Sequence, residues 1–317
     1  MQFLGFNRGL GSAPSGPVVV WGTHDMSGNI KFSVAFWNIE NFWGKAARTV
    51  RVARHLKSIR ADKKMPDVVA FCEIKDKGRI RDVIQKELSD YDFGLTDTGG
   101  SRASRKEQAE IELLVGWRRG LFDQTIFTQR VDLKAGREGV RPGALLNVRA
   151  GRTWYSLLFL HTKSGPDKSS YATRRKTFAR LWRLKAALKR LDKTKNHTAG
   201  SRLLVMGDLN TMGNGAGVSG KTEVRNLKRD AVKNGMDVPA KEHDLTFGQK
   251  SRRGGRLESD LDHVLTHRVR LRSLGRRDGK AYYVAVRGWN QLTDDPRKLR
   301  EYEKTLSDHS ALYVEVV

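Results

Sequence analysis

Short apolar segments separated by polar or glycine-rich stretches recur along the chain and predict β-strands. The segment 31–39 is apolar on both faces, because Phe32, Val34 and Phe36 alternate with Ala35 and Trp37. A strand with two apolar faces is typically covered on both sides. Similar short runs predict further strands at 68–72, 113–117, 144–148, 154–160, 202–206, 262–266 and 311–316.

Longer segments with a helical apolar stripe predict helices over 45–60, 78–88, 170–195 and 222–234. The strongest stripe lies in 170–195, where Thr177, Leu181, Leu184, Leu188 and Leu191 repeat at steps of four and three. Strands outnumber helices and do not follow a strict βαβ order. We therefore predict an α/β fold of two packed sheets with helices outside, rather than one doubly wound sheet.

No internal repeat or long low-complexity linker divides the sequence, which favours one catalytic domain over 31–317. Residues 1–30 are expected to be a loose lead-in, in which 18–21 has the pattern of a short edge strand. We see neither an 18-residue apolar stretch nor a secretory signal, so a cytoplasmic protein is expected. The single cysteine, Cys72, cannot form an internal disulfide and agrees with a reducing compartment.

The excess of basic residues is the strongest signal of the composition. Sixty Lys and Arg oppose thirty-five Asp and Glu, which gives a formal net charge of +25. A field of this sign attracts polyanions, so nucleic acid is the predicted partner. The alternative is a basic surface that serves only solubility.

Side chains suited to metal binding or proton transfer end five of the apolar segments. These segments are Phe36-Trp37-Asn38-Ile39-Glu40, Phe71-Cys72-Glu73-Ile74, Phe159-Leu160-His161-Thr162, Met206-Gly207-Asp208-Leu209-Asn210 and Ser307-Asp308-His309-Ser310. Phosphodiester hydrolysis requires neutralised phosphate oxygens, an activated water and a stabilised leaving oxygen. A divalent cation held by carboxylate and amide oxygens suits the first and third tasks. Together the five segments predict a metal-dependent phosphoesterase site.

The spacing within two of these segments supports this prediction. Asn38 and Glu40 are two residues apart and so face the same side of an extended chain, as do Asp208 and Asn210. Each residue alone has a simpler interpretation, because a lone Glu can end a strand in water and a lone His can be structural. An Asp-x-Asn segment can also be a plain turn. Their joint occurrence in one chain favours the site.

The order of these motifs resembles that of the endonuclease/exonuclease/phosphatase superfamily, which includes deoxyribonuclease I-like and exonuclease III-like enzymes. The matching elements are Asn38, Glu73, Gly207-Asp208-Leu209-Asn210, Leu261-Asp262-His263-Val264 and Ser307-Asp308-His309. The resemblance covers about residues 31–317 and implies a four-layer sandwich of two packed mixed β-sheets flanked by α-helices. Two features depart from the family outline, namely the long stretch 267–306 and the lead-in 1–30.

The resemblance also implies a metal site. Glu73, with Asn38 nearby, would hold Mg²⁺ or Mn²⁺, and Glu40 is a second, less certain ligand. His161 is similar to the branch of the family with a histidine at this step, and it would donate to a non-bridging or leaving oxygen.

The remaining motifs imply the catalytic groups. Asp208 and Asn210 would position or deprotonate the attacking water and bind the phosphate. His309, oriented by Asp308 or Asp262, would act as general base or as a phosphate ligand.

Loop and helix cations are the candidate contacts to a nucleic-acid backbone, and one aromatic residue is a candidate for stacking or wedging. These candidates are Arg252, Arg253, Arg256, Arg174, Arg175 and Trp289. A charged helix face is also typical of a solvated surface. A tryptophan in such a stretch also commonly closes a small satellite core.

Three functions therefore compete. The leading hypothesis is a divalent-metal-dependent nuclease that hydrolyses the DNA backbone with little sequence specificity. The second is a phosphoesterase for phospholipid head groups or inositol phosphates, since one fold hosts many substrates. The third is a non-catalytic nucleic-acid-binding relative. The sequence leaves DNA and RNA undistinguished.

Overall fold

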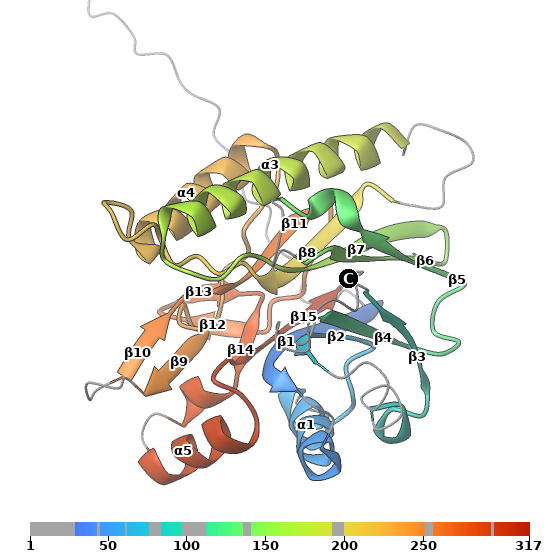
Figure 1. The fold of residues 1–317 in the computed structure, drawn as a ribbon. Coiled ribbons are helices and arrows are strands. Elements are labelled where there is room, and N and C mark those ends of the chain that lie inside the picture. Colours follow the sequence, from blue (N-terminus) through green and yellow to red (C-terminus); the bar gives the residue numbers. More distant parts are fainter. Residues whose placement is uncertain are drawn as a thin grey trace, which may run out of the picture.

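Two mixed β-sheets stack face to face in the computed structural model, and helices cover their outer faces (Figure 1). The described residues are 29–42, 45–60, 62–75, 84–96, 112–135, 141–191, 200–250, 256–292 and 295–317. The six-stranded sheet has the order β14-β15-β1-β2-β4-β3, and the five-stranded sheet has the order β11-β8-β7-β6-β5. This arrangement confirms the predicted α/β four-layer sandwich.

The strands have the following bounds. The six-stranded sheet contains β1 (Phe32–Phe42), β2 (Val68–Ile74), β3 (Tyr91–Leu95), β4 (Glu112–Arg118), β14 (Ala285–Arg287) and β15 (Ala311–Val316). The five-stranded sheet contains β5 (Gln124–Arg130), β6 (Gly143–Ala150), β7 (Thr153–His161), β8 (Arg202–Asp208) and β11 (Asp262–His267). Two small hairpins pair β9 (Phe247–Lys250) with β10 (Arg256–Ser259) and β12 (Gly275–Arg277) with β13 (Lys280–Tyr282).

The helices form the two outer layers. α1 (Ala46–Ile59) and α5 (Pro296–Thr305) cover the six-stranded sheet, while α3 (Lys168–Leu191) and α4 (Gly220–Lys233) cover the five-stranded sheet (Figure 1). Short 3₁₀ turns lie at η1 (Val131–Leu133) and η2 (Trp289–Gln291).

Three apolar cores hold the layers together. The central core fills the space between the sheets with inward-facing side chains such as Val34, Phe36, Phe159 and Met206, all fully buried. The other two lie between each sheet and its helices. One face of β1 contributes to the central core and the other face to an outer core. This explains why the strand is apolar on both faces.

Most predicted elements lie where expected, with shifts at their ends. The long helix runs over Lys168–Leu191, but Leu191 is 45% exposed, so the prediction that it belongs to the core stripe is wrong. The helix predicted at 78–88 is seen only at 84–87, since 76–83 lie outside the described residues, as does the edge strand predicted at 18–21. The stretch 267–306 forms the β12–β13 hairpin, β14, η2 and α5.

Among the described helices, none is both long and apolar enough to cross a lipid bilayer.

Candidate active site

Three neighbouring strands of the five-stranded sheet bring polar side chains to one edge. β7 and β8 run parallel with His161 paired to Asp208, and β11 runs antiparallel to β8 with Asp262 paired to Asp208. His161, Asp208 and Asp262 are therefore side by side at the same sheet edge. All three side chains are buried.

The six-stranded sheet supplies Asn38 and Glu73 from the parallel strands β1 and β2. The pairing of β1 with β2 has a register shift between Asn38 and Phe42. The pairing of β2 with β4 has a register shift between Cys72 and Ile74. Glu40 and Glu73 adopt left-handed backbone conformations with φ of 39° and 66°. Such values are uncommon for residues other than glycine and cluster at functional sites. The two irregularities place both glutamates at the end of the sheet.

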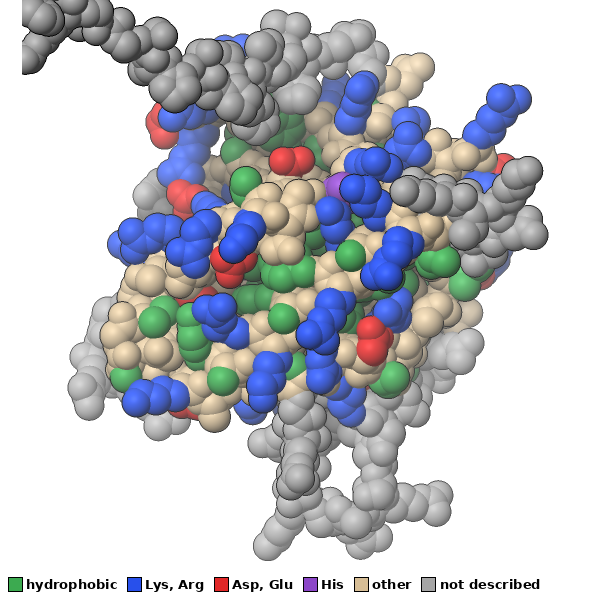
Figure 2. All heavy atoms as spheres, turned by 90° about the horizontal axis from the view of Figure 1, so that it is seen from above, with side chains coloured by type: hydrophobic (Ala, Val, Ile, Leu, Met, Phe, Trp, Pro, Cys, Tyr) green, Lys and Arg blue, Asp and Glu red, His purple; other side chains and the backbone are tan. Residues whose placement is uncertain are grey.

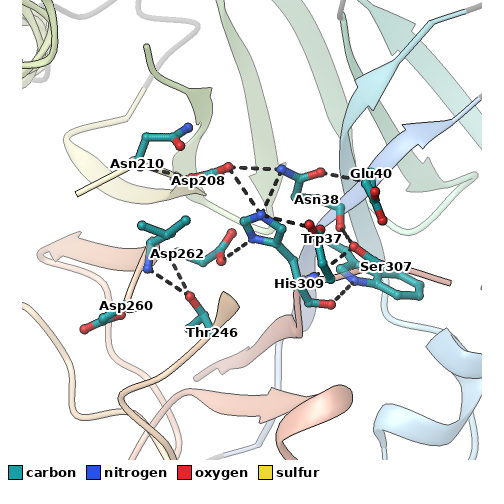
Figure 3. Close-up of polar contacts among 12 residues, drawn as sticks. Trp37, Asn38, Glu40, Asp208, Asn210, Thr246, Asp260, Asp262, Ser307 and His309 are labelled. Atoms are coloured by element: carbon teal, nitrogen blue, oxygen red, sulfur yellow. Dashed lines mark hydrogen bonds and ion pairs between the residues drawn. The ribbon is translucent and has the colours of Figure 1, made fainter. Parts of the chain in front are cut away.

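The Asn38 amide joins the two sheets at this edge. Its Nδ2 atom lies 3.0 Å from Asp208 Oδ2 and 3.4 Å from His309 Nε2 (Figure 3). The same atom lies 3.2 Å from Glu73 Oε1. The Asn38 side chain is only 1% exposed, and its Oδ1 accepts the backbone N–H of Glu40 at 3.0 Å. Asn38 is therefore a rigid donor at the centre of the cluster.

His309 enters the site from the segment before β15 and is held at several atoms. Its Nδ1 lies 2.8 Å from Asp262 Oδ2, and its backbone carbonyl accepts the Trp37 indole N–H at 3.0 Å (Figure 3). Burial would lower the pKa of His309, but the Asp262, Asp208 and Asp308 carboxylates outweigh it and raise the pKa to about 10. The imidazole is therefore cationic at neutral pH in this arrangement.

Asp208 lies between the imidazoles and Asn38. Burial and the nearby Asp262 raise the pKa of Asp208 to about 7, whereas the positive charge of His309 opposes this shift. Its Oδ1 accepts the backbone N–H of Asn210 at 2.9 Å. Asn210 itself has a left-handed φ of 47°, and its Nδ2 donates to Thr162 O at 3.2 Å.

His161 is a neutral member of the cluster. Its Nε2 lies 3.5 Å from Asp208 Oδ2 and 3.8 Å from Glu73 Oε1. Burial, together with the positive charges of Arg141 and His309, lowers the pKa of His161 well below its usual value. Its Nδ1 is buried and has no hydrogen-bond partner among the described residues.

Among the described residues, one group of three side chains has the spacing of a metal site. Ligand atoms of Asp208, Asp262 and His309 lie within 4.8 Å of one another. However, the hydrogen bond between His309 and Asp262 already occupies two possible ligand atoms of this group, Nδ1 and Oδ2.

A second set of carboxylates, Glu40, Glu73 and Asp308, is coupled through its charges, although only the first group meets the 4.8 Å spacing. Burial raises the pKa of Asp308 to about 7, and the negative charges of Glu40 and Glu73 add to this effect. The pKa of Glu40 is raised mainly by burial, with a further contribution from Glu73. Carboxylates that repel one another in a partly buried place suit a hard divalent cation. The three carboxylates of the second set therefore suit Mg²⁺ or Mn²⁺ by ligand type, while the first group has the closer spacing.

Two arginines near these carboxylates are not among the residues that the sequence singles out. Arg48 in α1 donates to the carbonyls of Ile39, Glu40 and Leu306, which joins the segments next to Glu40 and Asp308. Arg141 precedes β6 and is electrostatically coupled to Glu73 and Asp208. The sequence carries no signal for either, because Arg48 looks like a helix surface residue and Arg141 like a loop cation.

The predicted nucleic-acid contacts have different outcomes. Arg252 and Arg253 lie outside the described residues, and the structure describes only the backbone of Arg256, at the start of β10. Arg175 is exposed on α3. The prediction for Arg174 is wrong, since its guanidinium is fully buried and bonds Glu223 at 2.8 Å from both Nε and Nη2. Trp289 cannot stack on or wedge into a nucleic acid, because the indole is 1% exposed and donates to Thr246 O at 3.1 Å. Its place in an apolar core agrees with the core role that the sequence also offered.

The chain is similar to a known family in sequence and to several solved structures in fold. A sequence model described as the Endonuclease/Exonuclease/phosphatase family matches residues 35–309. Among curated proteins, no sequence is similar enough to count as a match.

Several solved structures share the fold. Truncated TDP2 from Caenorhabditis elegans has a TM-score of 0.57 at 15% identity, covering 90% of this chain and 97% of that chain. TDP2 from D. rerio, solved with a single-strand DNA product, has a TM-score of 0.53 at 15% identity, with coverages of 90% and 98%. The 3' phosphatase NExo from Neisseria, bound to a product DNA hairpin, has a TM-score of 0.54 at 13% identity, with coverages of 90% and 99%.

Proposed function

The chain belongs to the endonuclease/exonuclease/phosphatase family, and we propose that it is a divalent-metal-dependent nuclease that hydrolyses the DNA backbone with little sequence specificity. The observation that carries this proposal is the Asn38 amide, which donates to Asp208 and lies beside His309 Nε2 (Figure 3). The same amide donates to Glu73. Asn38 thus connects Glu73, a proposed metal ligand, with Asp208 and His309. Hydrolysis of a phosphodiester needs both parts.

Glu73, Glu40 and Asp308 would hold Mg²⁺ or Mn²⁺. The bound ion would supply positive charge that neutralises the phosphate oxygens and stabilises the leaving oxygen. Arg48 would hold the two segments of this site together, because it donates to the backbone carbonyls of Glu40 and Leu306.

Asp208 is the proposed general base. Its pKa of about 7 is close to the pH at which the protein would work, which is the favourable range for accepting a proton from water. The Asn210 N–H fixes Oδ1, so the carboxylate keeps a defined orientation. The proton of the attacking water would move to Asp208 while the oxygen attacks phosphorus and the opposite P–O bond breaks.

His309 and His161 are the proposed phosphate ligands. Cationic His309, held at Nδ1 by Asp262, presents Nε2 toward Asn38 and Asp208 and would donate to a non-bridging oxygen. Neutral His161 would add a second, uncharged donor. Of the two roles open to His309 from its sequence, the raised pKa favours phosphate ligand over general base.

DNA is the proposed substrate for two reasons. The formal charge of +25 favours a polyanion over a small head group or an inositol phosphate. Two proteins with the same fold were solved with DNA products, a single strand in one case and a hairpin in the other.

A substrate panel tests this proposal directly. We expect the protein at low salt to nick or shorten plasmid, linear duplex or abasic duplex in Mg²⁺ or Mn²⁺, with no reaction in EDTA. Cleavage of RNA alone would move the assignment to ribonuclease. Hydrolysis of phosphorylated lipids or inositols, with no nucleic acid cleaved, would contradict it.

A further inference from the structure

The outer helix layer on the five-stranded sheet holds nearly half of the net charge of the protein. α3 contains nine Lys and Arg and no acidic residue, and α4 contains five Lys and Arg against two acidic residues. Their net charge of +12 compares with +25 for the whole chain of 317 residues.

Most of these cations point to solvent without a carboxylate partner. Within the described part of the chain, only Arg174 and Arg229 of the two helices form ion pairs, with Glu223 and Asp230. Figure 2 looks onto this layer and shows Lys and Arg side chains spread over it with few acidic ones between. The exposed, unpaired cations include Arg175, Lys176, Arg183, Lys189, Lys228 and Lys233. We call this surface the α3–α4 face.

Several cations gather at the far end of α3. The pKa of Lys185 is lowered by partial burial and by the positive charges of Lys189 and Arg268. Burial lowers the pKa of His267, and the same three cations, Lys185, Arg268 and Lys189, add to this effect. A surface that repels its own cations has an uncompensated positive potential.

A groove of about 330 Å³ runs between α3 and α4 on this face. It is lined by aromatic side chains, among them Tyr171 and Trp182, and by the cations Arg175 and Lys233. The carboxylates Glu223 and Asp230 also line it, and they pair with Arg174 and Arg229. Cations beside a groove can neutralise the phosphates of a nucleic-acid backbone.

The α3–α4 face starts next to the candidate active site. α3 follows β7, which ends at His161, and α4 follows β8, which ends at Asp208. Both helices therefore begin at the sheet edge that carries the site. The 24 residues of α3 extend about 36 Å, a length that matches about ten base pairs of duplex.

We propose that the α3–α4 face binds the phosphate backbone of nucleic acid outside the active site. The identity of this polyanion rests on the proposed function, while the surface itself rests on charge, exposure and the groove. A nucleic acid fits better than an anionic membrane, because the cations are spread along a helix length and flank a groove with aromatic walls.

Binding of a labelled 40-base-pair duplex in EDTA tests the proposal without any turnover, so failure of the catalytic proposal would not affect it. The test variant is Arg175→Glu with Arg183→Glu and Lys189→Glu. The matched control is Arg51→Glu with Arg54→Glu and Lys57→Glu, three exposed cations of α1 on the opposite layer. Both triple variants change the net charge equally, and thermal melting checks that each is folded.

We expect the α3 variant to bind about 10-fold or more weakly at low salt, with the slope of log K against log salt flattened by about 2–3. The α1 variant should stay within about 3-fold of the wild type. Equal losses in both variants would overturn the proposal, because net charge alone would then explain binding. So would unchanged binding by the α3 variant. Loss of binding to phosphatidylserine vesicles, with duplex binding kept, would assign the face to a membrane instead.

Discussion

His309 and Asp262 lie 47 positions apart in the sequence, yet Nδ1 of the imidazole is 2.8 Å from Oδ2 of the carboxylate. This contact fixes the ring so that Nε2 faces Asn38 and Asp208. It also holds a positive charge on the ring, since Asp262 is the strongest of the carboxylates that raise the pKa of His309.

Replacement of Asp262 by Asn should therefore lower the single-turnover rate of cleavage by about 10³-fold or more, because the ring loses its charge and its orientation. Duplex binding by the same variant should stay within about twofold of the wild type. A rate within tenfold of the wild type would remove Asp262 from the mechanism.

Removal of one proposed metal ligand should weaken cation binding directly. For Glu73→Gln we expect Mn²⁺ affinity, measured by calorimetry without nucleic acid, to fall about 10-fold or more, with a higher Mg²⁺ requirement for cleavage. Glu301→Gln is the matched control, since Glu301 is exposed on α5. Equal Mn²⁺ affinity in wild type and Glu73→Gln would contradict the assignment of the metal site.

The buried Arg174–Glu223 ion pair should matter for stability and not for binding. Arg174→Ala leaves the Glu223 carboxylate buried without its partner, which costs about 3–5 kcal/mol in the free energy of unfolding. The neighbouring Arg175→Ala should change it by less than about 0.5 kcal/mol, since Arg175 is exposed. Denaturant unfolding of both variants measures the difference. Similar stabilities would show that the pair contributes little.

His55 should make stability dependent on pH. Its ring packs against Trp37 and Tyr302, and burial lowers its pKa to about 4 despite a hydrogen bond to Arg287 O. Between about pH 4 and the unfolded value near 6.5 the unfolded chain binds more protons, so stability is complete above about 6.5 and falls as the pH drops toward 4.

The loss from this one group is at most about 3 kcal/mol. His55→Phe keeps an aromatic ring and should flatten the fall in unfolding free energy between pH 7 and 4.5. Parallel pH profiles for wild type and variant would contradict this account.

The strand-end residues were predictable because two rules act together. Apolar runs mark strands, and strands of one sheet bring their polar ends to a common edge, as His161, Asp208 and Asp262 illustrate. The left-handed backbone of Glu73 was not predictable, because it depends on the irregular pairing of β2 with its neighbours.

Arg174 could have been placed correctly from the sequence. It precedes Thr177 by three positions and Leu181 by seven, so it continues the apolar stripe of α3 and faces the core. Its partner Glu223 lies on another helix and leaves no sequence signal. For Trp289 the sequence offered a core role, and the residue does lie in an apolar core.

The most direct test of the central claim is nicking of supercoiled plasmid at low salt in Mg²⁺ by wild type and Asp208→Ala, with EDTA as the blank. We predict that the wild type nicks only with the metal. The variant should lose most turnover and still bind a labelled duplex with nearly normal affinity. Near-normal nicking by Asp208→Ala, or nicking by the wild type in EDTA, would contradict a metal-dependent site built around Asp208.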